Sequence, residues 1–168
     1  MSENINYLAA TLVGECRGEP IEGQVAVANV IMNRFRAALL SPDKTQPVIG
    51  VKDICLAPKQ FSCWEENDMN FDLVREILSK LENGNEIKDP IIRQCIAVAR
   101  AVFNEDFIDN TKGAKNYVTI QRHQLAKARQ AKMDNWILKM KPSVVIGKHI
   151  FLVNPTKDFE KVMENRSV

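Results

Sequence analysis

The 168-residue sequence has no apolar run long enough to span a membrane, which takes about 18 residues. It also has no H-E-x-x-H, no G-x-S-x-G and no phosphate-binding loop, and these absences exclude several common classes of metalloprotease, α/β-hydrolase and nucleotide-binding enzyme. The first residues, MSENINYLAA, lack the basic stretch, apolar segment and cleavage site of a secretory signal. We therefore expect the chain to stay in the cytoplasm unless other machinery carries it out.

Cysteine and histidine are scarce, and they form no recognisable metal-binding pattern. The residues concerned are Cys16, Cys55, Cys63, Cys95, His123 and His149. No C-x-x-C pair occurs and no spacing resembles a zinc site, so we expect free, reduced thiols and no metal. A thiol–imidazole pair for amide cleavage, with Cys16 or Cys63 as nucleophile, stays open as another function. Structural, hydrogen-bonded histidines are the simpler interpretation.

The composition is typical of a soluble globular protein, with 45% apolar and 26% charged residues. The length fits one domain, placed at residues 1–152, followed by a C-terminal tail or short helix at 153–168. The net charge is only +2, but residues 112–148 contain nine Lys or Arg and one acid, so this segment carries +8 and the remainder −6. The basic segment indicates either an anionic partner or a solvated helix face.

Apolar residues recur at helical spacing in five segments of the chain. They predict helices at 4–16, 21–40, 71–81, 90–103 and about 120–140. The proline-rich residues 41–64 predict a long loop, and TKGAKNYV is turn-like. The β-prone runs in SVVIGKHIFLV predict a small hairpin. The expected fold is therefore mainly α with a small β-hairpin.

The segment VGECRGEP, residues 13–20, places acids and a thiol where the first helix ends and the second begins. The apolar stripe of the first helix leads onto Glu15, and a partly desolvated carboxyl holds its proton well enough to act as a general acid. Alternatively, Glu15 lies on the helix rim or pairs with Arg17 or Arg34. Glu19 and Glu22 flank Pro20, where acids favour the start of a helix. That structural role suffices for them, although either is a possible second carboxylate.

The loop segment PKQFSCW combines an amide, a hydroxyl and two aromatic rings. The side chains concerned are Gln60, Phe61, Ser62 and Trp64. Such a set is typical of a groove that binds a sugar polymer by stacking and hydrogen bonding. Phe61 and Trp64 are equally explained as anchors that hold a long loop on the core.

Four segments, in this order, carry a resemblance to a known family: LVGECRGEPIEGQVAVANVIMNR, PKQFSCW, TKGAKNY and IGKHIF. Over about residues 5–152 the chain resembles the catalytic domain of SleB/CwlJ-type cell wall hydrolases, named for spore cortex-lytic enzymes. The resemblance implies a lysozyme-like fold that cleaves peptidoglycan between N-acetylmuramic acid and N-acetylglucosamine, as a lytic transglycosylase with 1,6-anhydromuramic products. The alternatives are a hydrolytic lysozyme that uses a second carboxylate and a non-catalytic envelope-binding or virion-structural protein.

The resemblance also implies roles for individual residues. Glu15 matches the catalytic acid of an E-A-R-G-E-like pattern, and no metal or organic cofactor is implied. The residues implied to line the substrate groove are Gln60, Phe61, Ser62, Tyr117 and, as a groove or structural residue, His149. Cys16 replaces the usual Ala of the pattern, and the Lys and Asn before Tyr117 replace more aromatic residues.

A lone catalytic domain without a visible export signal is what a bacteriophage endolysin presents, although a piece of a larger secreted enzyme looks the same. We therefore expect host cytoplasm first, then periplasm or cell wall. The expected partner is peptidoglycan, with electrostatic contact to an anionic envelope. We expect no nucleic-acid partner and a monomer.

Overall fold

The computed structural model describes residues 2–40, 50–129 and 135–155. The helices are α1 (Glu3–Cys16), α2 (Ile21–Leu40), α3 (Val51–Cys55), the 3-10 helix η1 (Ser62–Trp64), α4 (Phe71–Glu82), α5 (Pro90–Phe103), α6 (Ile120–Arg129) and α7 (Asn135–Lys139). The strands are β1 (Asn116–Thr119), β2 (Lys141–Ile146) and β3 (His149–Val153). The predicted mainly helical fold is confirmed, and the predicted hairpin is β2–β3, with β1 as a third strand.

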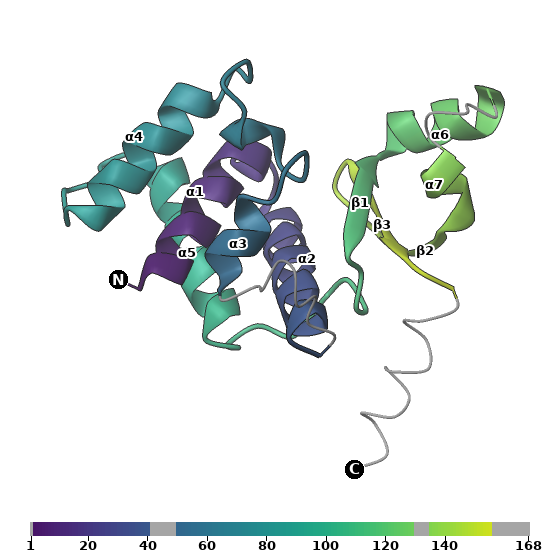
Figure 1. The fold of residues 1–168 in the computed structure, drawn as a ribbon, viewed down its shortest axis with the longest axis horizontal. Coiled ribbons are helices and arrows are strands. Elements are labelled where there is room, and N and C mark those ends of the chain that lie inside the picture. Colours follow the sequence, from purple (N-terminus) through teal and green to yellow (C-terminus); the bar gives the residue numbers. More distant parts are fainter. Residues whose placement is uncertain (1, 41–49, 130–134, 156–168) are drawn as a thin grey trace, which may run out of the picture.

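Helix α1 lies at the centre of the helical part, among α2, α3, α4 and α5 (Figure 1). The Ser2 hydroxyl caps its first turn by accepting a hydrogen bond from the Ile5 N–H at 3.4 Å. Leu8, Leu12 and Val13 are fully buried, as are residues on other sides of the helix. A helix that is surrounded by other helices is expected to carry apolar side chains on all its faces. A polar side chain near its end is therefore expected to have specific polar partners.

The turn between α1 and α2 is held by the start of α2. The Pro20 carbonyl accepts hydrogen bonds from the N–H groups of Gly23 at 2.9 Å and Gln24 at 3.0 Å. The fully buried Gln24 side chain returns a bond from Nε2 to the Glu19 carbonyl at 3.0 Å. The predicted helix boundary at VGECRGEP is therefore correct, and its geometry is fixed by contacts on both sides.

The sheet is antiparallel with the order β1-β3-β2. Side chains alternate between the two faces of β3: Phe151 and Val153 pack against α2, and Ile150 and Leu152 pack toward α6 and α7. The pairing of β2 with β3 is irregular between Pro142 and Val144. The sheet thus lies between α2 and the α6–α7 pair, and it brings β1 beside the helical part (Figure 1).

Three sequence predictions need correction or completion. A single helix over about 120–140 is wrong, because α7 is a separate helix that packs against α6; residues 130–134 lie outside the described residues. Within the predicted loop 41–64, residues 50–64 contain α3 and η1, while 41–49 lie outside the described residues. TKGAKNYV turns at Lys112 and Gly113, with φ of 58° and 83°, but continues as β1.

Two further sequence predictions are tested only in part, because they include residues that the structure does not describe. Of the expected tail at 153–168, residues from 156 onward are not described. In the described ranges, none of the helices combines the length and apolar character needed to cross a membrane.

Candidate active site

Glu15 lies in the last turn of α1, partly buried, and both of its carboxyl oxygens accept hydrogen bonds. The backbone N–H of Cys63, in η1, donates to Glu15 Oε1 at 3.3 Å. The hydroxyl of Tyr117, in β1, donates to Glu15 Oε2 at 3.3 Å. A helix, a loop and the sheet therefore meet at this one carboxyl group.

The close approach of η1 to α1 depends on Gly14. A Cβ at this position would lie 2.4 Å from Cys63 Cβ and 2.7 Å from Val74 Cγ2, distances that no side chain tolerates. The Asn70 side chain adds a bond from Nδ2 to the Gly14 carbonyl at 3.1 Å. The glycine thus allows the Cys63 N–H to reach the carboxyl of the neighbouring Glu15.

Tyr117 is held by ring contacts within the sheet. Its ring lies 5.7 Å from the Phe151 ring and meets His149 edge-on at 5.2 Å. Burial, and next the charge of Glu15, raise the pKa of Tyr117, so its phenol keeps its proton. Since a hydroxyl both donates and accepts, this contact suits the ionised and the protonated form of Glu15.

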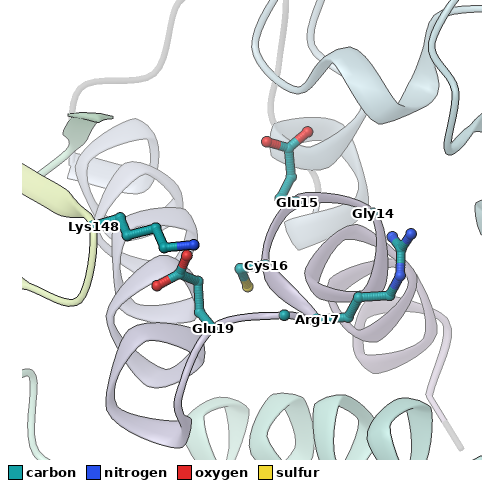
Figure 2. Close-up of a pocket in the computed structure, with 7 residues that line it drawn as sticks. Gly14, Glu15, Cys16, Arg17, Glu19 and Lys148 are labelled. Carbon is teal, nitrogen blue, oxygen red and sulfur yellow. The ribbon is translucent and has the colours of Figure 1, made fainter. Parts of the chain in front are cut away.

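A pocket of about 290 Å³ opens beside Glu15 (Figure 2). Its lining residues are Gly14, Glu15, Cys16, Arg17, Gly18, Glu19 and Lys148. Figure 2 shows Glu19 and Lys148 pointing toward one another, from the α1–α2 turn and the β2–β3 turn. A Cβ on Gly147, whose φ is +56°, would lie 2.6 Å from Glu19 Oε2, so the hairpin turn packs directly on this carboxylate.

The acidic and basic residues that the sequence suggests as neighbours of Glu15 occupy different places in the structure. Glu19 lines the same pocket, whereas Glu22 is exposed in the first turn of α2. Arg17 Nη1 donates to the Val13 carbonyl at 2.9 Å, and Arg34 Nε donates to the Lys115 carbonyl. In the described part of the chain, neither arginine forms an ion pair with Glu15.

The predicted groove residues occupy different environments. Trp64 is partly buried, stacks 5.6 Å from the Tyr7 ring and donates from Nε1 to Thr11 Oγ1 at 3.0 Å. Phe61 is only 3% exposed, so it anchors the loop, one of the two interpretations that the sequence left open. Gln60 and Ser62 are exposed, and the Ser62 hydroxyl donates to Asp68 Oδ2 at 2.6 Å.

His149 borders the site and joins it to the hairpin. Its imidazole is partly buried against the Tyr117 ring. Burial lowers the pKa of His149, while the charges of Glu19 and Glu15 oppose this shift. The neutral imidazole is thus favoured by its surroundings, and His149 belongs to the wall around Tyr117.

The thiols are poorly suited to nucleophilic chemistry. Cys16 and Cys63 are 3% and 1% exposed, and all four cysteines are free and buried. Burial is the largest cause that raises the pKa of both Cys16 and Cys63. Because the reactive form of cysteine is the thiolate, this environment disfavours the thiol-amidase alternative. Among the described residues, no group of three or more His, Cys, Asp or Glu is arranged to hold a metal ion.

Sequence reasoning missed two contributors to the site, Thr11 and the backbone N–H of Cys63, and it gave Arg34 a different role. Thr11 precedes Glu15 by one helical turn and is fully buried, so its polarity within the apolar stripe was a usable signal. The sequence named Arg34 as a possible ion-pair partner of Glu15; it lies near both Glu15 and Tyr117 as a cation within an apolar helix. The backbone N–H of Cys63 carries no sequence signal, because any residue except proline supplies one.

Comparison with known proteins identifies relatives of the chain. The profile of the Cell Wall Hydrolase family matches residues 18–152. Spore cortex-lytic enzymes are similar: that of Oceanobacillus iheyensis is 41% identical over 81 residues, and that of Bacillus subtilis is 48% identical over 48 residues. These alignments span 48% and 29% of this chain, and only 28% and 15% of the relatives.

Two solved structures share the fold. The catalytic domain of the Bacillus cereus SleB protein has a TM-score of 0.52 at 24% identity and covers 90% of each chain. The catalytic domain of the germination-specific lytic transglycosylase SleB from Bacillus anthracis has a TM-score of 0.53 at 24% identity, covering 91% of this chain and 96% of that one. Glu15 lies just before the residues matched by the family profile, so its candidacy rests on the geometry above. The chain belongs to the Cell Wall Hydrolase family.

Proposed function

We propose that the protein cleaves peptidoglycan glycan strands between N-acetylmuramic acid and N-acetylglucosamine as a lytic transglycosylase, with Glu15 as its acid and base. One observation carries the proposal: Glu15 lines the pocket, and a loop amide and a sheet hydroxyl each contact one of its carboxyl oxygens. The solved relative described as a lytic transglycosylase supports the same reaction type.

In the first step, protonated Glu15 donates its proton to the glycosidic oxygen as the bond to the anomeric carbon breaks. The N-acetylglucosamine leaves as an alcohol, and an oxocarbenium-like muramic sugar remains. Glu15 becomes a carboxylate at this moment. The Cys63 N–H and the Tyr117 hydroxyl are already placed to donate to its two oxygens, so the new charge needs no reorganisation of the site.

In the second step, the C6 hydroxyl of the muramic sugar attacks its own anomeric carbon. The Glu15 carboxylate takes the hydroxyl proton, which returns the carboxyl to its starting state. The product is a 1,6-anhydromuramic end, and no water is consumed. One carboxyl therefore suffices for the cycle.

Glu19 is the residue on which a hydrolytic lysozyme mechanism would depend. It lines the same pocket as Glu15, and the hairpin turn packs against its carboxylate. In a hydrolytic reaction a second carboxylate activates water or bonds to the sugar, and the product carries a reducing end. We favour transglycosylation because one carboxyl suffices for it, and because a solved relative with this fold is described as a lytic transglycosylase.

The test is digestion of purified peptidoglycan by the wild-type protein and by Glu15→Gln, with the released muropeptides identified by mass spectrometry. We expect 1,6-anhydromuramic ends from the wild type and none from the variant. Glu15→Gln should remain folded, since an amide fills the same space. Activity retained in this variant would refute the assignment of Glu15.

Two neighbouring acids provide matched comparisons with the same exchange. Glu22→Gln, at an exposed position outside the pocket, should leave rate and product unchanged. Glu19→Gln should still give anhydro ends under the proposed mechanism. Reducing ends from the wild type that vanish in Glu19→Gln would establish the hydrolytic mechanism instead, and free peptides would establish an amidase.

We further propose that the enzyme serves bacterial cell lysis, as expected of an endolysin, and that its basic surface assists. Lys127, Lys139 and Lys148 are exposed on α6, α7 and the hairpin turn. Such cations attract an anionic envelope, and salt screens the attraction. Binding to isolated cell walls should weaken at high salt, and the protein should clear a suspension of permeabilised bacteria. Salt-independent binding or no clearing would contradict this role.

A further inference from the structure

Arg34, in the middle of α2, joins the two segments that contact Glu15. Its Nε donates to the Lys115 carbonyl at 2.6 Å, and its Nη2 donates to Asn116 Oδ1 at 3.5 Å. On its other side the guanidinium carbon lies 5.2 Å from the centre of the Phe61 ring. One side chain thus contacts the start of β1 and the residue that leads into η1.

Both contacted segments continue directly into a hydrogen-bond donor to Glu15. Asn116 precedes Tyr117, and Phe61 lies two positions before Cys63. The bonds from Tyr117 and from the Cys63 N–H are both 3.3 Å long, which is longer than the usual range. A small displacement of either segment therefore removes a contact to the carboxyl.

Packing alone does not explain why a charged guanidinium is buried at position 34. Its Nη1 is buried and has no hydrogen-bond partner among the described residues, an arrangement that costs free energy. Burial lowers the pKa of Arg34, whereas Tyr117, Cys55 and Glu15 favour its charged form. An apolar side chain of similar length would fill the space without this penalty.

We infer that Arg34 is a positioning residue for the reaction at Glu15, setting the places of Tyr117 and of the Cys63 N–H. The role rests on the proposed function of Glu15 as acid and base. Arg34 acts through its neighbours, so its replacement lowers the rate of the bond-breaking step and leaves substrate affinity unchanged.

The principal variant is Arg34→Lys, which keeps the positive charge but loses the planar fork that bonds and stacks at once. We expect kcat on peptidoglycan to fall roughly tenfold with KM unchanged, because small misplacements of catalytic groups have effects of this order. The matched control is Arg36→Lys on the same helix, where Arg36 bonds Glu105 at 3.0 Å at the surface. It should retain wild-type kcat and KM.

A double-mutant cycle with Tyr117→Phe separates positioning from general stability. If Arg34 acts through Tyr117, Arg34→Lys should reduce kcat less in the Tyr117→Phe background than in the wild type. Fully multiplicative losses, a rise in KM alone, or a wild-type kcat in Arg34→Lys would each overturn the inference.

A second readout needs no activity. The chain has two tyrosines, so 3-fluorotyrosine labelling gives two ¹⁹F NMR signals, which Tyr7→Phe assigns. The Tyr117 signal should move in Arg34→Lys and stay in place in Arg36→Lys; an unmoved signal in both would contradict the role. If the wild type releases no fragments, the proposed function fails, while this spectrum still decides whether Arg34 positions Tyr117.

Should Arg34→Lys fail to fold, Phe61→Leu replaces it as the decisive variant. This exchange keeps an apolar side chain in the core but removes the ring beneath the guanidinium. The same loss of kcat at constant KM is expected. A folded Phe61→Leu protein with wild-type kcat would count against the coupling.

Discussion

The Tyr117 hydroxyl bonds Glu15 Oε2 at 3.3 Å and so links residues 102 positions apart in the chain. Glu15 belongs to the central helix, and Tyr117 belongs to a strand that exists only through its pairing with β3. The Glu15 carboxyl therefore accepts both of its hydrogen bonds only when the helical part and the sheet are packed together.

Tyr117→Phe should lower activity without unfolding the protein. The ring keeps its contacts with Phe151 and His149, so we expect a loss of about 1 kcal/mol in the free energy of unfolding. The loss of a donor that stabilises the Glu15 carboxylate should reduce kcat by roughly 10-fold to 100-fold. Steady-state rates of muropeptide release and urea unfolding measure the two effects. A wild-type kcat would show that the hydroxyl takes no part.

Gly14→Ala should reduce both stability and activity. The added methyl group would overlap Cys63 and Val74, so η1 must move away from α1. Overpacking of this kind destabilises by about 1–3 kcal/mol, and the Cys63 N–H would lose Glu15. Gly18→Ala is the comparison for stability, because nothing lies within 4 Å of a Cβ there. Equal unfolding free energies in the two variants would contradict the steric explanation.

Treatment with a cysteine-alkylating reagent should leave the native enzyme active, because its buried cysteines react slowly. Burial raises the pKa of Cys55 to about 12 and of Cys95 to about 11, and it raises those of Cys16 and Cys63 as well. Thiolates are thus rare near neutral pH, and the sulfurs are covered. Iodoacetamide followed by mass spectrometry should label the native protein slowly and the urea-unfolded protein at all four sites. Activity lost in parallel with labelling would restore the thiol-amidase alternative.

Stability should decrease as the pH falls below about 6.5, the usual pKa of histidine. Burial lowers the pKa of His149 and of His123 in the folded state, so the unfolded chain binds more protons in this range. The free energy of unfolding therefore rises with pH up to about 6.5, and the loss at low pH levels off below the folded pKa values.

Two measurements check this dependence. NMR titration should place both imidazole midpoints below 6.5, and His149→Gln should reduce the slope of unfolding free energy against pH. A midpoint for His149 above the usual value would mean that Glu19 and Glu15 outweigh burial, and the contribution of His149 to the slope would change sign.

The helices were predictable because their signals are local. The sequence placed helices at 21–40 and 90–103, and these are the bounds of α2 and α5. Asp89 caps α5 by accepting hydrogen bonds from the N–H groups of Ile91 and Ile92, with Pro90 in the first turn. Strand β1 was missed because its four residues form a strand only through β3, and α3 was missed because five residues carry too little periodicity.

The only part of the site that was predictable is the part that lies within a single segment of the sequence. Glu15 follows from an apolar stripe that ends on an acid, together with the family resemblance. Its contacts with Tyr117, the Cys63 N–H and the region of Arg34 depend on how distant segments pack, which a single sequence does not encode at any one position. The same reason explains why the sequence left Phe61 open between anchor and groove.

The irregular pairing of β2 bears on how the folded protein behaves at high concentration. In the order β1-β3-β2, β2 is an edge strand, and its first residues are Lys141 and Pro142. Proline has no N–H to offer, and the register shift between Pro142 and Val144 interrupts the regular ladder. A strand from another molecule therefore meets no continuous template along β2, which disfavours strand addition at this edge of the sheet.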